Sequence, residues 1–194
     1  MVAADEKDRE RWNRKYAGEE YILGQEPIAF LCQHVHLLPT GKALDIATGE
    51  GRNGVYLATQ GYHVLGLDVS EIGLRKAHRL ARELNTTIET HVVDLENTQL
   101  ATREYDVIVV SYYLQRDLFP RIKKALKCGG MIVMETYNED HARYKADFPS
   151  AYLLKTNELL EVFKDFHIIR YQAVDDGKSK AYSSILARKP CLDP

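Results

Sequence analysis

The chain has 194 residues, with 26 Lys or Arg and 28 Asp or Glu, and its formal net charge is −2. This length is typical of one domain, and the balanced charge offers no basic surface for nucleic acid or an anionic membrane. No apolar run approaches the roughly 20 residues of a membrane span. The charged N-terminus lacks a signal peptide's apolar core, and the three scattered cysteines fit no metal motif. These features predict a reducing, cytoplasmic setting.

Helical and strand patterns alternate along the first half of the chain, which predicts a parallel sheet. In chain order we expect a helix at 27–36, a strand at 43–47, a helix at 52–60, and strands at 63–67 and 88–93. Gly61 is expected to end the second helix. Ser70 is expected to cap a further helix that runs to Leu84, because apolar residues there follow the spacing i, i+3, i+4, i+7.

The second half continues the alternation and ends in a hairpin. Strands are expected at 106–110, 131–136, 167–174 and 182–187. The last two flank Asp176-Gly177, a dipeptide typical of hairpin turns. Asp117 and Thr156 are expected to cap the two intervening helices. The segment 138–155 is long for a loop in a compact domain, which indicates a functional or mobile segment.

These elements predict an α/β, Rossmann-like, doubly wound fold. Its seven-stranded sheet is expected to be mostly parallel, with one antiparallel strand supplied by the C-terminal hairpin. We expect a single domain, 1–194. It would comprise an N-terminal arm and helix at 1–36, a cofactor-binding core at 42–137, and a substrate-side loop, helix and hairpin at 138–194.

The most informative segment is 49–54, which reads Gly-Glu-Gly-Arg-Asn-Gly after a short apolar run. Glycines permit positive φ and close approach of a ligand, and the following helix offers N–H groups. The segment matches the dinucleotide fingerprint, with Asp68 near the position of the ribose-binding acid. Carboxylates at Asp45 and Glu50 would repel a pyrophosphate and attract a cationic cofactor. S-adenosylmethionine, which carries a sulfonium and no phosphate, is therefore favoured over NAD.

These residues resemble the first motif of the class I S-adenosylmethionine-dependent methyltransferases. Its four places are taken by Asp45, Ala47, Gly49 and Gly51, with Ala47 where Gly is usual. Asp68 and Asp94, each after a strand, are similar to the family's ribose-binding and adenine-binding acids. Residues 127–130 resemble its Lys-Pro-Gly-Gly turn, with Cys128 for Pro.

The likeness extends to the entry segments 12–16 and 21–27 and to the tail 184–189, which look like the tellurite-resistance-type group. The resemblance implies S-adenosylmethionine as cofactor and S-adenosylhomocysteine as product. No metal is expected, because the histidines and cysteines form no metal-ligand spacing. The resemblance implies cofactor contacts at Asp45, Ala47, Gly49, Gly51, Arg52, Asn53, Asp68, Val69, Asp94, Leu95 and Ser111.

The reaction implied is methyl transfer to a small-molecule nucleophile by in-line displacement, in which alignment is the main catalytic effect. Strand four ends in Ser-Tyr-Tyr-Leu, without the Asn/Asp-Pro-Pro-aromatic motif of enzymes that methylate base amino groups. The catalytic residue is open, with Tyr16 and Tyr21 as lid candidates and Glu135 and Tyr137 as substrate contacts. His141 is expected to be exposed.

Two alternatives remain at this stage. The fingerprint and the Asp68 spacing allow an NAD-dependent oxidoreductase. The second alternative is a non-catalytic module that binds S-adenosylmethionine or its product and regulates a partner, since binding alone requires the same motifs. The methyl acceptor and the oligomeric state are not determined by the sequence.

Overall fold

The computed structural model describes the backbone of residues 2–191 and the side chains of residues 6–191. The chain divides into two compact units, Met1–Gln99 and Leu100–Pro194. The seven strands belong to one mixed sheet, which confirms the expected α/β fold with an antiparallel addition near the C-terminus. Within the described residues, no helix is both long enough and apolar enough to cross a membrane.

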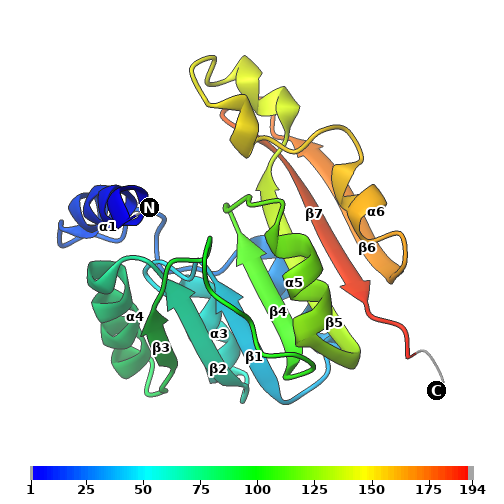
Figure 1. Ribbon diagram of the computed structural model, residues 1–194, viewed down its shortest axis with the longest axis horizontal. Helices are drawn as coiled ribbons and strands as arrows, with labels where there is room; N and C mark the ends of the chain where they lie inside the picture. Colours follow the sequence, from blue (N-terminus) through cyan, green and yellow to red (C-terminus); the bar gives the residue numbers. More distant parts are fainter. Residues whose placement is uncertain (1, 192–194) are drawn as a thin grey trace. The chain divides into compact units, whose positions relative to one another are not determined.

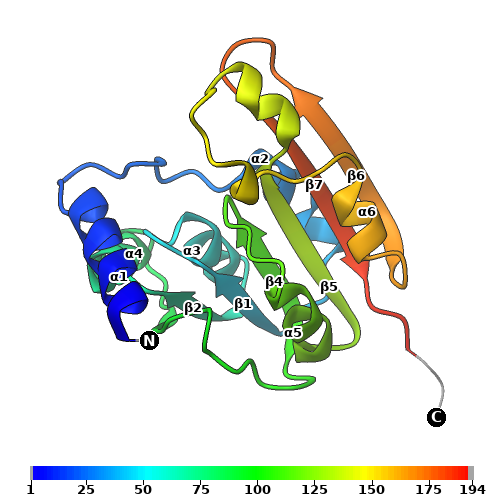
Figure 2. The same cartoon turned by 45° about the horizontal axis from the view of Figure 1, so that its top comes forward.

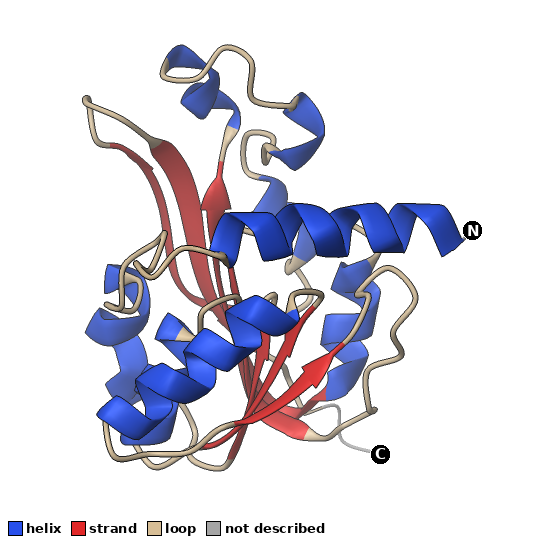
Figure 3. Cartoon of the chain, turned by 90° about the vertical axis from the view of Figure 1, so that its left-hand side faces the viewer, coloured by secondary structure: helices blue, strands red, loops and turns tan. Residues whose placement is uncertain are grey.

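The first unit carries three parallel strands in the order β3-β2-β1 (Figure 1). Its elements are α1 (Val2–Tyr16), α2 (Ala29–His34), a 3-10 turn (Val35–Leu37), β1 (Lys42–Ile46), α3 (Arg52–Thr59), β2 (His63–Asp68), α4 (Glu71–Glu83) and β3 (Glu89–Val92). Helix α3 packs on β1 and β2, and α4 packs on β2 and β3. Figure 3 shows α1 crossing next to α4, with which it is in contact.

Local signals explain most boundaries in this unit. Ser70 caps α4, since its hydroxyl accepts a hydrogen bond from the N–H of Gly73 at 3.1 Å. Gly61 takes φ 89° just after α3, as expected for a helix stop. The segment expected only as an arm is different, because Val2–Tyr16 forms a helix. Its charged residues gave no apolar stripe, and its docking on α4 supplies the burial instead.

The second unit carries strands in the order β4-β5-β7-β6. Its elements are β4 (Tyr105–Ser111), α5 (Leu118–Ala125), β5 (Leu126–Tyr137), 3-10 turns at Glu139–Arg143 and Ser150–Tyr152, α6 (Glu158–Val162), β6 (His167–Asp175) and β7 (Ala181–Arg188). Strands β4 and β5 are parallel, while β7 is antiparallel to β5 and to β6. Figure 2 shows the β6–β7 hairpin with α6, which contacts β7.

The structure corrects two expected caps in this unit. Asp117 precedes α5, but among the described residues its side chain makes no capping hydrogen bond. Thr156 does not cap α6, because Asn157 holds that place with φ 59°. The Thr156 hydroxyl instead bonds Glu139. Both residue types favour caps on average, but the Thr156 hydroxyl has a side-chain partner elsewhere.

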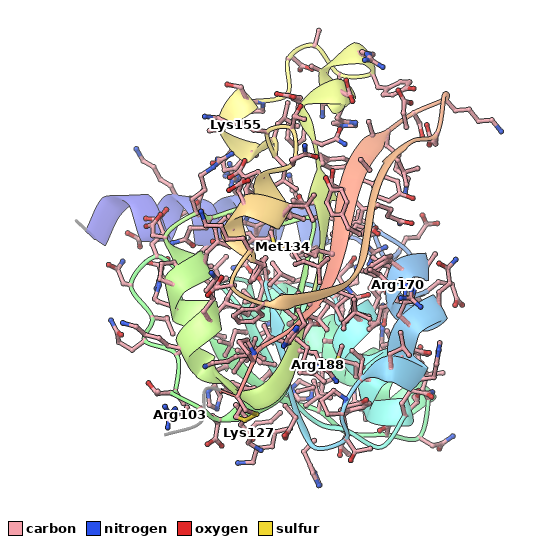
Figure 4. All side chains as sticks on the ribbon, turned by 90° about the vertical axis from the view of Figure 1, so that its right-hand side faces the viewer. Arg103, Lys127, Met134, Lys155, Arg170 and Arg188 are labelled. Atoms are coloured by element: carbon pink, nitrogen blue, oxygen red, sulfur yellow. A yellow bond between two sulfur atoms is a disulfide. The ribbon has the colours of Figure 1, made fainter. Side chains whose placement is uncertain are left out.

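The start of β5 also differs from the expected turn. Residues 127–130 lie inside β5, and Gly129 takes φ 74° where the pairing with β4 is irregular. Cys128 forms a disulfide with Cys191, which disagrees with the expected reducing setting, while Cys32 is a free cysteine. Figure 4 shows the sulfur atoms beside Lys127. The partners are separated by 63 residues, so spacing alone could not pair them.

Candidate cofactor-binding site

The glycine loop is fixed by close approaches that exclude side chains. Gly49 and Gly51 both have positive φ, 55° and 88°. A Cβ on Gly51 would lie 2.5 Å from the Cβ of Ala77 in α4, and a Cβ on Gly49 would lie 2.7 Å from the hydroxyl of Tyr16. Ala47 also takes positive φ, 54°. Alanine at this position, where the motif usually has glycine, therefore adopts a strained backbone conformation. The loop thus needs its two glycines for packing as well as for conformation.

Asp45 organises this loop from the end of β1. Its side chain is almost fully buried, and Oδ2 accepts hydrogen bonds from the Thr48 hydroxyl at 2.6 Å and the Gly54 N–H at 2.8 Å. Burial raises the pKa of Asp45 to about 6, although these two bonds oppose the shift. The other oxygen, Oδ1, is buried and finds no hydrogen-bond partner in the part of the chain described. This oxygen remains available to a donor or cation on a bound molecule.

Asp68 ties the end of β2 to the same loop. Its Oδ2 accepts the N–H of Gly49, and its Oδ1 accepts the N–H of Ser70, both at 2.8 Å. Burial raises the pKa of this carboxyl, against the pull of those backbone hydrogen bonds. Each carboxylate oxygen retains a second lone pair. The site therefore fits a ligand that donates hydroxyl hydrogen bonds, as a ribose does.

Asp94 follows β3 and is partly exposed. Its Oδ1 accepts the Glu96 N–H at 2.9 Å, and its Oδ2 accepts from the side chain of Asn97. The backbone just before Asp94 lies next to the end of β2, because the Val93 N–H donates to the Asp68 carbonyl at 2.8 Å. Of the remaining candidates, Leu95 is buried, Val69 is half-buried, and Ser111 ends β4 in the second unit.

Glu50 has a different role from the one expected. Its buried carboxylate forms an ion pair with the Lys76 ammonium, and its Oε2 accepts the Ile22 N–H at 2.8 Å. The pairing compensates the charge of Glu50. The expectation that Glu50 attracts a cationic cofactor thereby loses its basis, because its charge is already balanced within the protein.

Arg52 and Asn53 hold the segment that leads into α2. The Asn53 Oδ1 accepts the Ile28 N–H at 3.0 Å, and the Asn53 side chain is buried. The Arg52 guanidinium donates to the Leu23 carbonyl at 3.0 Å. These contacts give both residues a structural task in addition to the proposed cofactor contact.

The two tyrosines expected in a lid lie in different places. Tyr16 is 5% exposed, stacks on Trp12 with ring centroids 5.5 Å apart, and lies against Gly49. Burial and then the charges of Asp68 and Glu50 raise its pKa. Tyr21 instead lies on α4, where its hydroxyl donates to the Lys76 carbonyl at 3.2 Å. The structure thus brings Tyr16 to the glycine loop and leaves Tyr21 on the helix.

Sequence reasoning missed two residues of this site. Asn13 crosses to the start of α4, where its Oδ1 accepts from the Ser70 hydroxyl at 2.6 Å. Lys76 was assigned no role, yet it is buried among polar groups. The sequence did contain an indication that Lys76 is buried, because it lies among apolar residues on the predicted buried face of a helix.

A second polar cluster, Tyr112, Glu135, Lys180 and Ser184, lies in the second unit and is called here the hydroxyl–carboxylate cluster. Buried Glu135 accepts hydrogen bonds from the Tyr112 hydroxyl at 3.1 Å and the Ser184 hydroxyl at 2.7 Å. Lys180 donates to the Tyr112 hydroxyl at 3.3 Å. Tyr112 takes φ 51°, an uncommon conformation for an aromatic residue that is often found at functional sites.

Tyr137 and His141 extend this region as an aromatic stack. Their ring centroids are 4.0 Å apart with an interplanar angle of 10°, and His141 is buried. The expectation that His141 is exposed is wrong, because the long segment folds back in 3-10 turns over Tyr137. Burial, reinforced by the charge of Lys145, lowers the pKa of His141.

Comparison with known proteins assigns the chain to a family. The model of the family described as "Tellurite resistance protein TehB" matches residues 13–180. A protein of Haemophilus influenzae named "Probable S-adenosyl-L-methionine-dependent methyltransferase TehB" is 31% identical over 139 residues, which cover 67% of this chain and 47% of that protein. The chain therefore spans about half the length of this curated relative.

Solved structures agree on the fold. The crystal structure of TehB from Haemophilus influenzae superposes with a TM-score of 0.71 at 22% identity, covering 93% of this chain and 66% of that one. Geranyl diphosphate C-methyltransferase from Streptomyces coelicolor, solved with S-adenosyl-L-homocysteine, gives a TM-score of 0.65 at 18% identity, covering 82% and 74%. With its motifs, its sheet and its family match in agreement, the chain belongs to the TehB tellurite resistance family.

Proposed function

We propose that the protein transfers a methyl group from S-adenosylmethionine to a small-molecule nucleophile and releases S-adenosylhomocysteine. The observation that carries the proposal is the pair of buried carboxylates that hold the glycine loop in a member of the TehB family: Asp45 accepts the Gly54 N–H and Asp68 accepts the Gly49 N–H. Asp68 has lone pairs for further hydrogen bonds, and the buried Asp45 Oδ1 has no partner among the described residues. Both features fit a cofactor that has hydroxyl donors and positive charge.

We assign roles to the cofactor-binding residues from these contacts. Asp68 accepts hydrogen bonds from the ribose hydroxyls, and Asp45 Oδ1 accepts from the ammonium of the methionine part. Asp94 receives the adenine amino group, with Val69 and Leu95 against the ring. The turn formed by Ala47, Gly49, Gly51, Arg52 and Asn53 lies along the methionine part, and Ser111 adds a further contact. Tyr16 covers the glycine loop and excludes water from it.

The acceptor is proposed to bind at the hydroxyl–carboxylate cluster, with Glu135 and Tyr137 among its contacts. Lys180 supplies positive charge and Tyr112 a hydroxyl, which suits a nucleophile with an ionised oxygen or chalcogen. The name of the family suggests a tellurium oxyanion as one such acceptor. In the reaction the acceptor's lone pair forms the new bond to carbon, while the electron pair of the C–S bond returns to sulfur and discharges the sulfonium.

Alignment of the two reactants supplies most of the catalysis in this proposal. A neutral alcohol or amine would need a base with a pKa near neutrality. Glu135 already accepts two hydroxyl hydrogen bonds, so an acceptor that is ionised before it binds is favoured. We also propose that residues 1–194 act as one methyltransferase domain.

A screen for released S-adenosylhomocysteine tests the proposal across thiols, chalcogen oxyanions, amines and carboxylates. Turnover is expected with a thiolate, a chalcogen oxyanion or a carboxylate, at a rate that follows the acceptor's ionisation. Binding of S-adenosylmethionine without turnover on any of these acceptors would instead favour a regulatory module. Tighter binding of NAD than of S-adenosylmethionine would favour an oxidoreductase.

A further inference from the structure

Lys76 is a buried cation whose partners all lie outside its own helix. The residue is 7% exposed, and its ammonium donates to the carbonyl oxygens of Gly18 at 2.9 Å and Glu20 at 2.6 Å. A third, longer bond reaches the carbonyl of Tyr16 at 3.4 Å. Lysine is almost never fully buried unless it is paired, so this arrangement is a specific one.

All three carbonyls belong to residues 16–22, called here the arm segment, which begins at the last residue of α1. Glu50 completes the arrangement from the opposite side. Glu50 forms an ion pair with the Lys76 ammonium. It also accepts a hydrogen bond at 2.8 Å from the N–H of Ile22, the last residue of the arm segment. Since Glu50 lies within the glycine loop, the pair joins the arm segment to the loop through two side chains.

The contacts of Lys76 also affect the position of Tyr16. Its carbonyl is one of the Lys76 acceptors, and its hydroxyl lies where a Cβ on Gly49 would approach within 2.7 Å. Its ring lies against Gly73, where an added Cβ would come within 3.1 Å. The position of this ring therefore depends on the backbone that Lys76 holds.

We infer that Lys76 and Glu50 are positioning residues for cofactor binding, which dock the arm segment on the glycine loop and set Tyr16 over it. The inference rests on the proposed cofactor site at that loop. Docking and cofactor binding then favour each other, because each stabilises the same conformation of Glu50 and its loop. The alternative is that the pair only neutralises two buried charges.

A double variant distinguishes the two explanations. Lys76→Met leaves Glu50 as an uncompensated buried charge, which is destabilising in itself. Glu50→Gln with Lys76→Met removes both charges and keeps similar side-chain volumes, but it still lacks the donor to the arm carbonyls. Arg82→Met is the matched control, since Arg82 is an exposed cation in the last turn of the same helix.

The measurements are the dissociation constant for S-adenosylmethionine by calorimetry and the acrylamide quenching of Trp12, with and without the cofactor. Trp12 is the single tryptophan of the chain and lies in α1, where it stacks on Tyr16. Its quenching therefore reports on the packing of Tyr16, the first residue of the arm segment. We expect binding about tenfold weaker in the double variant, in the range of ordinary coupling between sites. The cofactor should protect Trp12 in the unaltered protein and in Arg82→Met, and should fail to do so in the double variant.

Wild-type affinity and wild-type protection of Trp12 in the double variant would overturn the inference while leaving the proposed function intact. An equal loss in Arg82→Met would overturn it too, by showing a general effect of charge on α4. Failure of the unaltered protein to bind S-adenosylmethionine would refute the proposed function itself. If Lys76→Met does not fold, the double variant alone decides.

Discussion

Asp45 and Asp68 in the first unit and Glu135 in the second are buried carboxylates that are held in different ways. In the first, Asp45 and Asp68 accept backbone N–H groups of the glycine loop, from residues 9 and 19 positions away. In the second, Glu135 accepts side-chain hydroxyls from residues 23 and 49 positions away. Backbone donors come with any sequence that makes the turn, while hydroxyl donors must be supplied by particular distant residues. The first arrangement is therefore a compact motif, and the second is visible only once the strands have paired.

The sharpest way to break the first arrangement is Gly51→Ala. The new methyl group would meet Ala77 at 2.5 Å with φ at 88°, so overpacking and left-handed strain act together. We expect the free energy of unfolding to fall by about 3 kcal/mol, measured by urea denaturation. Gly61→Ala is the control, since φ is 89° there but nothing lies within 4 Å of the added Cβ. Equal losses at both glycines would show that the contact with Ala77 is unimportant.

Asp68→Asn tests the proposed ribose contact in the same loop. Asparagine keeps one carbonyl oxygen for a backbone N–H but loses the charge that strengthens hydrogen bonds to hydroxyls. Cofactor affinity should fall by about tenfold to a hundredfold, as expected for loss of a charge-assisted bond. Calorimetry measures the affinity, and thermal unfolding of the same samples monitors the fold. An unchanged dissociation constant would remove Asp68 from the cofactor site.

The pH dependence of cofactor binding sharpens the role of Asp45. Its pKa is raised to about 6, so this side chain gains a proton as pH falls through that value. A bound cation favours the ionised form, and affinity should drop by about tenfold between pH 7.5 and pH 5. Stability without cofactor should respond in the opposite sense. The folded state holds this proton more tightly than the unfolded state, so the contribution of Asp45 is lost as pH rises through 6.

Asp45→Asn provides the control for this titration. The variant keeps an acceptor for Thr48 and Gly54, and its affinity should be independent of pH over that range. A pH profile that survives the substitution would assign the titration to another group.

Tyr112→Phe tests the second unit and is expected to have the smallest effect. It removes one neutral hydroxyl from Glu135 and leaves the ring against Tyr137, 4.9 Å away. The KM for the acceptor should rise about fivefold, in line with a hydrogen bond of about 1 kcal/mol, with the cofactor dissociation constant unchanged. A change in cofactor affinity of the same size would contradict a role confined to the acceptor.

The sequence by itself determined the alternating strands and helices, the glycine loop and its flanking acids. These features lie within single strand–turn–helix units, where local conformation and periodicity decide the outcome. It also indicated the hairpin around Asp176-Gly177, since a short turn brings adjacent strands together without help from the rest of the chain.

The tertiary structure alone decided which polar groups meet. Glu50 pairs with Lys76, His141 is buried rather than exposed, and Cys128 is bonded to Cys191. The helix at the N-terminus also depended on its partner, because Asn13 and Tyr16 dock on α4 and the glycine loop. Apart from the stack of His141 on Tyr137, these contacts join residues far apart in sequence. The free energy that selects them comes from burying both partners together, which no local pattern records.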